Sequence, residues 1–476
     1  MKRILLFILI ISYGFAYSDT IPVTIYGTHK DYAGQIIEVY KTADYITHTK
    51  KVIAVDTVDK QGNFKLQYKT AETLLISMPL GIYNAVLFTA PGKSYNVVLP
   101  PFQPKTKVDI ITPFFKPVEI YLGIKDSDST DLNFQIADFN DKYYNFIDSN
   151  YYYIFKHSEK KFIDSVITLF EKKFVSDTVI FFKNYRIYKY AWLKFVSYMR
   201  DDRYVIREYF NDKPVLYQNP AYMDLFNQLF ANYLTIYSNK PEGERLYSDV
   251  AFAKSPKYIY ETFENNMVLL NDTLQEFVLL KGLYDEFYQK NYNISSLLIT
   301  LDSVKTLTTV DEHKMIADNI RKKVLKTRSG FPAAKFELRD ANGIFRSSND
   351  YLANYVYLNF MSVESFSCQQ DLELLKKLYE KHKTDFKIIS ISIDDDFEKA
   401  VDYFKQNGYN WTLLSYKEQK NIIDEYNVKA YPTYYLIDPD GKFAMSPAAS
   451  PGENFEWYFF KMLQAKKRRQ LREENK

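Results

Sequence analysis

The chain has 476 residues and a formal net charge of +3, from 62 basic and 59 acidic side chains. A charge so close to zero does not favour long-range attraction to nucleic acid, so we expect no nucleic-acid partner. The chain is long enough to form several domains, and 46% of its residues are hydrophobic and can form their cores. Its single cysteine, Cys368, excludes an intramolecular disulfide and any two-cysteine catalytic cycle within one molecule.

Residues 1–16 have the composition of a secretory signal peptide. Lys2 and Arg3 precede an apolar run at 4–11, which is followed by the small residues that a signal peptidase recognises. The run is too short to cross a membrane, and no later segment reaches the roughly 20 apolar residues that a spanning helix needs. No cysteine lies near the cleavage site, as a bacterial lipoprotein would require. We therefore expect a periplasmic or secreted protein without a membrane span.

Residues 17–118 predict an antiparallel β-sandwich. Ile21, Val23 and Ile25 alternate with polar residues, and further strand-length segments follow, separated by turn sequences such as residues 59–63. Five prolines between positions 100 and 117 indicate the end of this domain.

Residues 125–328 predict an all-α middle region. It begins with an acidic and serine-rich linker or helix start at 126–131, and apolar side chains then recur at helical steps, as at Phe277, Leu280 and Tyr284. The helices form either a separate domain or a packing collar for the C-terminal part.

Residues 329–476 predict an α/β fold. Buried strands are expected at 355–360 and 386–394, because both segments are apolar and the second is rich in isoleucine. The helix between them begins with Ser365 or Ser367 as its N-cap. A strand, a helix and a second strand imply a parallel strand pair with a right-handed connection.

Residues 359–368, Asn-Phe-Met-Ser-Val-Glu-Ser-Phe-Ser-Cys, carry the most informative motif. They resemble the active-site turn Asn-Phe-Trp-Ala-x-Trp-Cys-x-x-Cys of TlpA-like, AhpC/TSA-related thiol-disulfide oxidoreductases, which have a thioredoxin-like fold and act in cell redox homeostasis. In this alignment Ser365 replaces the nucleophilic cysteine, Glu364 replaces the second tryptophan, and Cys368 occupies the place of the resolving cysteine. The active site is therefore degenerate.

Other segments resemble the same family in order along the chain. Residues 331–343 resemble its entry hairpin, residues 430–438 its cis-proline segment, and residues 439–442 the turn of its last hairpin. The predicted β-sandwich resembles the DUF4369-type domains that precede TlpA-like domains in exported Bacteroidota proteins. The resemblance implies a thioredoxin-like C-terminal domain and a cis peptide bond at Pro432.

Cys368 leaves three hypotheses open. The Ser365-x-x-Cys368 spacing is similar to the Thr-x-x-Cys turn of peroxiredoxins, which would make Cys368 a one-cysteine catalytic thiol. It could instead be a reactive thiol without a catalytic role, or a buried residue that acts as a small apolar side chain. Ser365 is expected to be a helix cap, since a serine hydroxyl without a neighbouring base is a poor nucleophile.

Peptide binding is the function that survives the loss of the first cysteine. In the resembled family the residue before the cis-proline presents its backbone to an extended substrate, and that residue is Tyr431. The candidate binding residues are Tyr431, Pro432, Glu364 and Phe366, although Tyr431 and Pro432 could equally be a plain strand entry. We expect a non-catalytic protein that binds a polypeptide or an envelope partner; the alternative is a one-cysteine thiol peroxidase or reductase.

No cofactor or metal site is predicted. The five histidines are scattered, with no pair at ligand spacing, and the acidic run at 394–396 is better interpreted as a strand end and helix cap than as a calcium loop. The sequence leaves the partner and the oligomeric state open.

Overall fold

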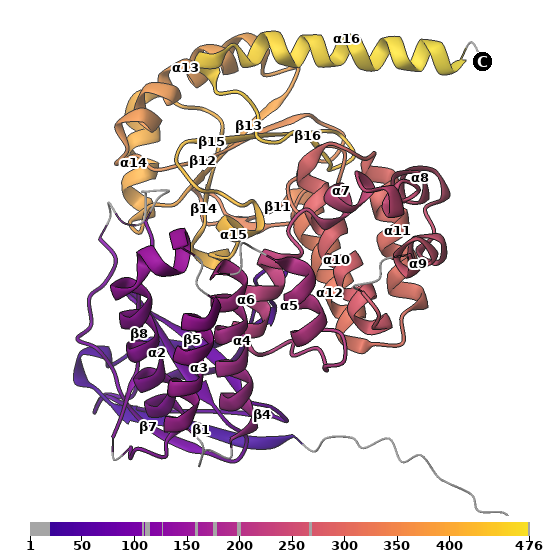
Figure 1. Ribbon diagram of the computed structural model, residues 1–476. Helices are drawn as coiled ribbons and strands as arrows, with labels where there is room; N and C mark the ends of the chain where they lie inside the picture. Colours follow the sequence, from indigo (N-terminus) through magenta and orange to yellow (C-terminus); the bar gives the residue numbers. More distant parts are fainter. Residues whose placement is uncertain are drawn as a thin grey trace, which may run out of the picture. The chain divides into compact units, whose positions relative to one another are not determined.

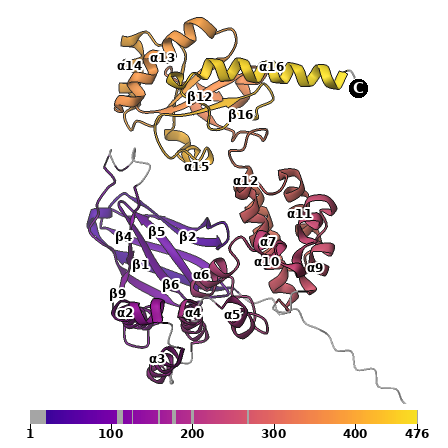
Figure 2. The same cartoon turned by 45° about the horizontal axis from the view of Figure 1, so that its top comes forward.

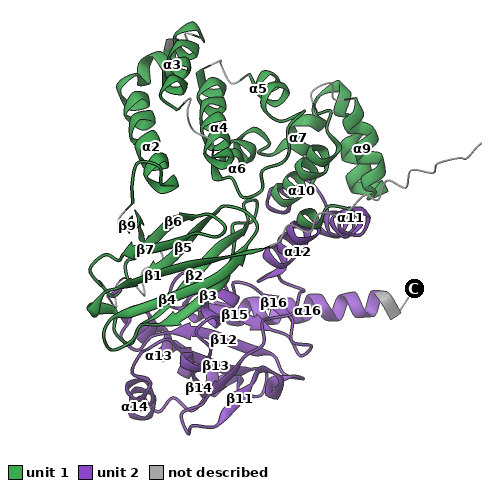
Figure 3. Cartoon of the chain, turned by 90° about the horizontal axis from the view of Figure 1, so that it is seen from below, with its two compact units in different colours: residues 1–104, 117–286, 309–313 green, residues 105–116, 287–308, 314–476 purple. Residues whose placement is uncertain are grey.

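The computed structural model describes residues 20–106, 109, 115–125, 127–157, 160–174, 179–197, 201–265 and 269–474. The predicted signal peptide at 1–16 lies outside them. The chain divides into two compact units, shown in green and purple in Figure 3. Unit 1 comprises Met1–Pro104, Pro117–Glu286 and Thr309–His313, and unit 2 comprises Lys105–Lys116, Phe287–Thr308 and Lys314–Lys476.

Unit 1 opens with a β-sandwich (Figure 2). Its strands are β1 (Ile21–Thr28), β2 (Ile36–Asp44), β3 (Thr49–Thr57), β4 (Asn63–Thr70), β5 (Leu74–Leu80), β6 (Tyr83–Thr89), β7 (Ser94–Val98), β8 (Val118–Tyr121) and β9 (Gly123–Ile124). One sheet has the order β4-β1-β7-β9 and the other the order β3-β2-β5-β6-β8. Alternating apolar and polar residues let these strands bury one face. In β4, Phe64, Leu66 and Tyr68 are buried while the residues between them are exposed. Both sheets contribute to one apolar core.

The sandwich extends to Ile124 and so passes the predicted end at 118. Strand β8 pairs in parallel with β6, and β9 pairs antiparallel with β7. The prolines at 100, 101 and 104 lie in the connection that leaves β7. These prolines interrupt the strand pattern locally, but the chain returns to both sheets as β8 and β9. The pairing of these strands with β6 and β7 leaves no local signal in the sequence.

The helices that follow in unit 1 confirm the predicted helical middle region. They are α2 (Leu132–Ser149), α3 (Lys160–Lys173), α4 (Ile180–Ser197), α5 (Asp202–Tyr209), α6 (Pro220–Leu229), α7 (Tyr233–Ser238), α8 (Leu246–Ser248), α9 (Pro256–Glu264) and most of α10 (Asp272–Gln289). Asp131 is the N-cap of α2, since its carboxylate accepts the N–H groups of Asn133 and Phe134. The Asn133 side chain exchanges two hydrogen bonds with the backbone of Phe88 in β6, which attaches α2 to the sandwich.

Unit 2 contains the predicted α/β domain (Figure 1). Its elements are α11 (Ile294–Leu307), most of α12 (Asp311–Leu325), β10 (Glu337–Arg339), β11 (Phe345–Ser347), β12 (Val356–Met361), α13 (Phe366–His382), β13 (Lys387–Ser392), α14 (Phe397–Asn407), β14 (Thr412–Ser415), α15 (Ile422–Glu425), β15 (Thr433–Ile437), β16 (Phe443–Met445) and α16 (Phe455–Glu474). The five-stranded sheet has the order β14-β13-β12-β15-β16, and β10 and β11 form the entry hairpin. Strand β12 pairs in parallel with β13 and antiparallel with β15, so the predicted parallel pair is confirmed.

Both faces of the central sheet are covered. On one face Tyr357 and Met361 of β12 pack with side chains of α13, α14 and α16. On the other face Leu358 and Phe360 pack with the segment around α15, including Tyr426. Every residue of β12 is buried, as expected for the central strand of a sheet covered on both sides. The predicted fold class is therefore confirmed. Across the described part of the chain, no helix has the length and apolar character to span a membrane.

Candidate functional site

The turn between β12 and α13 is built around Ser365. This residue has extended backbone angles and is the N-cap of α13, where its Oγ accepts the backbone N–H of Cys368 at 3.5 Å. Its Oγ also lies 3.0 Å from the Oγ of Ser367. An N-cap serine satisfies one of the free N–H groups of the first helical turn. The residue in the position of the nucleophilic cysteine thus stabilises the helix.

Cys368 is enclosed by the fold. Only 1% of its surface is exposed, and it belongs to the apolar core that includes Met361 and Leu372. Burial raises the pKa of its thiol, and the Ser365 hydroxyl opposes only part of this shift. Since the thiolate is the reactive form of cysteine, an enclosed thiol with a raised pKa is poorly suited to nucleophilic chemistry near neutral pH.

Tyr431 packs against the apolar core that contains Cys368. The peptide bond between Tyr431 and Pro432 is cis. Burial raises the pKa of Tyr431 to about 12. Within the described residues, neither the backbone N–H nor the C=O of Tyr431 forms a hydrogen bond. A free main-chain edge of this kind can pair with an extended peptide.

The two remaining predicted binding residues flank Ser365 on the outside of the turn. Phe366, the first residue of α13, has 72% of its surface exposed, and Glu364 is also exposed. An exposed phenylalanine at the start of a helix contributes nothing to the core and offers apolar surface to a partner. At the start of α13 an apolar ring and a carboxylate are therefore exposed close in sequence to a buried thiol.

Asp394 stabilises the turn between β12 and α13 through hydrogen bonds, and the sequence did not reveal this role. The residue follows β13 and is 8% exposed. Its carboxylate accepts the hydroxyl of Ser362 at 2.5 Å, the N–H of Val363 at 3.1 Å and the hydroxyl of Ser392 at 2.8 Å. Asp394 follows the end of β13, and Asp396 is at the N-cap position of α14 but its side chain makes no cap hydrogen bond. Only the parallel pairing of β12 and β13 brings Asp394 under the turn.

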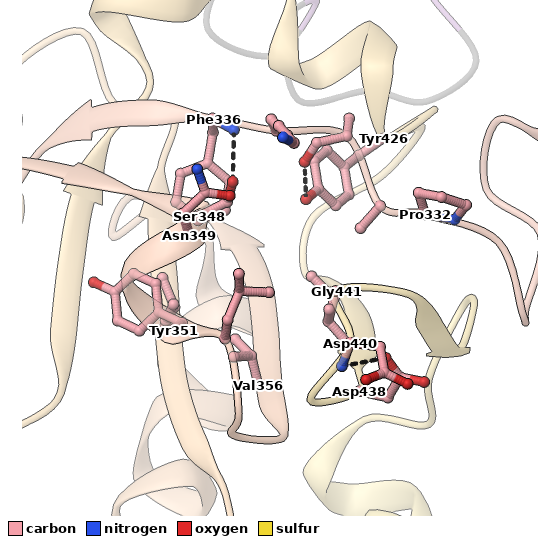
Figure 4. A pocket seen from close by; sticks show the side chains of 16 residues that line it. Pro332, Phe336, Ser348, Asn349, Tyr351, Val356, Tyr426, Asp438, Asp440 and Gly441 are labelled. Carbon is pink, nitrogen blue, oxygen red and sulfur yellow. Dashed lines mark hydrogen bonds between the residues drawn. The ribbon is translucent and has the colours of Figure 1, made fainter.

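A separate cavity of about 210 Å³ opens in the same domain (Figure 4). Its walls are mainly apolar and include Phe336, Tyr351 and Val356. The Tyr426 hydroxyl donates to the carbonyl of Ala334 at 2.7 Å and so fixes one wall. Val356 begins β12, whereas the turn follows its other end, and none of the predicted site residues lines this cavity. Among the described residues, no three His, Cys, Asp or Glu side chains are grouped to hold a metal ion.

A covered five-stranded sheet, a capped helix after its central strand and a proline loop before β15 define a thioredoxin-like domain. The chain belongs to the thioredoxin-like family of thiol-disulfide oxidoreductases, as its sequence predicted: residues 353–443 match the family model described as thioredoxin-like. The thiol-disulfide oxidoreductase ResA of Bacillus thuringiensis (strain Al Hakam) is 30% identical over 118 residues, which cover 25% of this chain and 68% of ResA.

Two further proteins are similar to part of the chain. The thioredoxin-like protein YneN of Bacillus subtilis is 28% identical over 122 residues, covering 25% of this chain and 71% of YneN. The crystal structure of the thioredoxin domain of a Bacteroides vulgatus thiol-disulfide oxidoreductase is 21% identical, covers 28% of this chain and 98% of that chain, and has a TM-score of 0.27.

Proposed function

We propose that this protein is a non-catalytic member of its family that binds an extended polypeptide, or a partner protein of the cell envelope, at the turn around Ser365. The observation that carries the proposal is the free backbone of Tyr431, which packs against the core that encloses Cys368. An extended chain can pair with Tyr431 through main-chain hydrogen bonds, and side-chain contacts then provide specificity. Phe366 and Glu364 are the residues that we expect to make those contacts.

The loss of thiol chemistry leaves this binding surface intact. In the resembled family the first cysteine forms a mixed disulfide with the substrate; here Ser365 caps α13, so binding must be non-covalent and reversible. The predicted signal peptide at 1–16 supports a periplasmic or secreted location, where unfolded and extended polypeptides are available as ligands.

Site-specific photocrosslinking in the native host tests the proposal. A photoreactive phenylalanine analogue at position 366 should give a discrete crosslinked product whose partner peptide can be identified by mass spectrometry. The product should diminish strongly when Pro432→Ala and Tyr431→Asp change the loop. The same analogue at Trp457, which is 54% exposed on α16, is the matched control. Equal products from both positions, or indifference to the loop variants, would overturn the proposal.

The one-cysteine enzyme is the alternative function and is tested with the same purified protein. Peroxide consumption with a thiol donor that disappears in Cys368→Ala would establish it. The closed thiol predicts that neither wild type nor variant consumes peroxide above the rate of the donor alone.

A further inference from the structure

Unit 1 contains a cavity of about 340 Å³ that the proposed function does not use. It is lined by residues of α2, α4 and α6 and by His48, in the turn between β2 and β3. This volume lies in the range of pockets that enclose small molecules. The lining combines several aromatic rings with one carboxylate and one ammonium group.

The aromatic walls are held in place by their own polar atoms. The Tyr143 hydroxyl donates to the carbonyl of Lys189 at 2.8 Å, and the Tyr188 hydroxyl donates to the carbonyl of Tyr209 at 2.7 Å. Trp192 Nε1 donates to Oε1 of Gln228 at 3.0 Å. Tyr143 and Tyr188 are themselves buried, so the carbon surface open to a ligand comes from the exposed Tyr144 and the half-buried Trp192. The hydrogen bonds preorganise these walls.

The charged groups of the cavity differ in how they are partnered. The Lys189 ammonium lies 2.9 Å from the hydroxyl of Tyr144 and 5.4 Å from the centre of that ring. The Asp224 carboxylate, in contrast, forms no hydrogen bond or ion pair with any other residue that the structure describes, and the residue is exposed to solvent. Partial desolvation by the surrounding protein raises the pKa of Asp224, while Lys189 and His48 oppose the shift. An exposed carboxylate without a protein partner can accept hydrogen bonds from a ligand in place of water.

The turn that carries His48 is itself a specifically built structure. Asp44 accepts the N–H groups of Ile46 and Thr47 at 3.1 and 2.7 Å and the hydroxyl of Thr47 at 2.6 Å. His48 follows with φ at 54°, in the left-handed region that is costly for a residue with a side chain. Such a conformation is maintained only where the surrounding structure imposes it, and here it brings an imidazole to the cavity.

We propose that this cavity binds a neutral, hydroxyl-rich ring compound of the size of a disaccharide. A saccharide has carbon-bound hydrogens that pack on aromatic rings, and its hydroxyls both donate to Asp224 and accept from Lys189, His48 and the Gln228 amide. A cationic ligand would meet Lys189, and an anionic ligand would meet Asp224, so the opposite charges favour a neutral molecule.

Calorimetric titration of the purified protein tests this inference. The probes are maltose, cellobiose, lactose and N,N′-diacetylchitobiose, with benzyltrimethylammonium and benzoate as charged ring compounds. At least one disaccharide should bind, and Asp224→Asn and Trp192→Ala should each weaken that binding about tenfold or more. Asp440→Asn, at the other cavity, is the matched control and should have no effect.

Two kinds of result would overturn it. The cavity does not select neutral hydroxyl-rich rings if no disaccharide gives a binding heat at high millimolar concentration. The same conclusion follows if a charged probe binds more tightly than every disaccharide. Binding that persists unchanged in both Asp224→Asn and Trp192→Ala would place the saccharide elsewhere. His48→Gly, which relieves the left-handed backbone, provides a third variant that should fold and bind less tightly.

Discussion

The hydroxyl of Ser365 accepts the backbone N–H of Cys368, so the residue in place of the family's nucleophile serves to fix the position of the only cysteine in the chain. The two residues remain one helical turn apart, as the two cysteines are in the resembled motif. What has changed is their chemistry, because one side chain caps the helix and the other fills the core.

Cys368 should be slow to react with alkylating reagents while the protein is folded. Burial raises its thiol pKa, so the neutral thiol persists above the usual value of about 8.5 and labelling should rise only at higher pH. Intact mass spectrometry from about pH 6 to pH 10 measures the rate, and the same protein in denaturant gives the unhindered rate. Rapid labelling of the folded protein with a midpoint below the usual pKa would contradict the closed site.

Ser365→Cys should restore the ability to form a disulfide with Cys368. Position 365 is half-buried at the start of α13, where the helix dipole and free N–H groups favour a thiolate. We expect mild oxidation to remove two hydrogens from the intact mass and to protect both thiols from labelling. Loss of the serine cap should lower the free energy of unfolding by about 1 kcal/mol.

The control for this experiment is Ser367→Cys, which adds a thiol next to Cys368 in sequence without occupying the cap position. It should remain reactive after the same treatment. If Ser365→Cys also keeps two free thiols, then the turn has diverged in geometry as well as in residue type.

Asp394→Asn should destabilise the protein by about 2 kcal/mol. The carboxylate accepts three hydrogen bonds, and an amide of the same size directs an NH₂ group at donors that need an acceptor. Urea unfolding measures the loss. Asp395→Asn, at an exposed neighbouring position, should change stability by less than about 0.5 kcal/mol. Equal effects of the two variants would show that Asp394 does not hold the turn.

The sequence predicted the elements whose signals are local. The apolar runs predicted β12 and β13. The sequence left Ser365 and Ser367 as alternative caps of the helix, and the structure has Ser365. It could not predict that Asp394 lies under the turn, since this depends on the pairing of two strands separated by a helix. The sequence also did not predict the cavity of unit 1, because residues 48, 143, 189, 192 and 224 come from segments far apart in the chain.

Stability at acid pH should depend on Glu456. Its carboxylate accepts a hydrogen bond from Lys381 at 2.5 Å, and this bond is the main cause of its lowered pKa; a contact with His382 adds to it. The folded pKa lies below the unfolded value of about 4.3, so the stabilisation is present above that pH and is lost as the pH falls through the folded pKa.

Glu456→Gln should therefore flatten the decrease in melting temperature between about pH 6 and pH 3.5. Glu380→Gln, at an exposed position of α13, is the control and should retain the wild-type dependence on pH. A steeper decrease in Glu456→Gln than in wild type would reverse the assigned sign.

The burial of Cys368 determines how the folded protein responds to oxidants and thiols. Oxidants, glutathione and thiol-disulfide exchange factors act on accessible sulfur, and the sole cysteine is closed to them in the folded state. The molecule thus keeps one cysteine state whether its compartment is oxidising or reducing. Partner binding of the kind proposed here would therefore depend on concentration and affinity and not on redox potential.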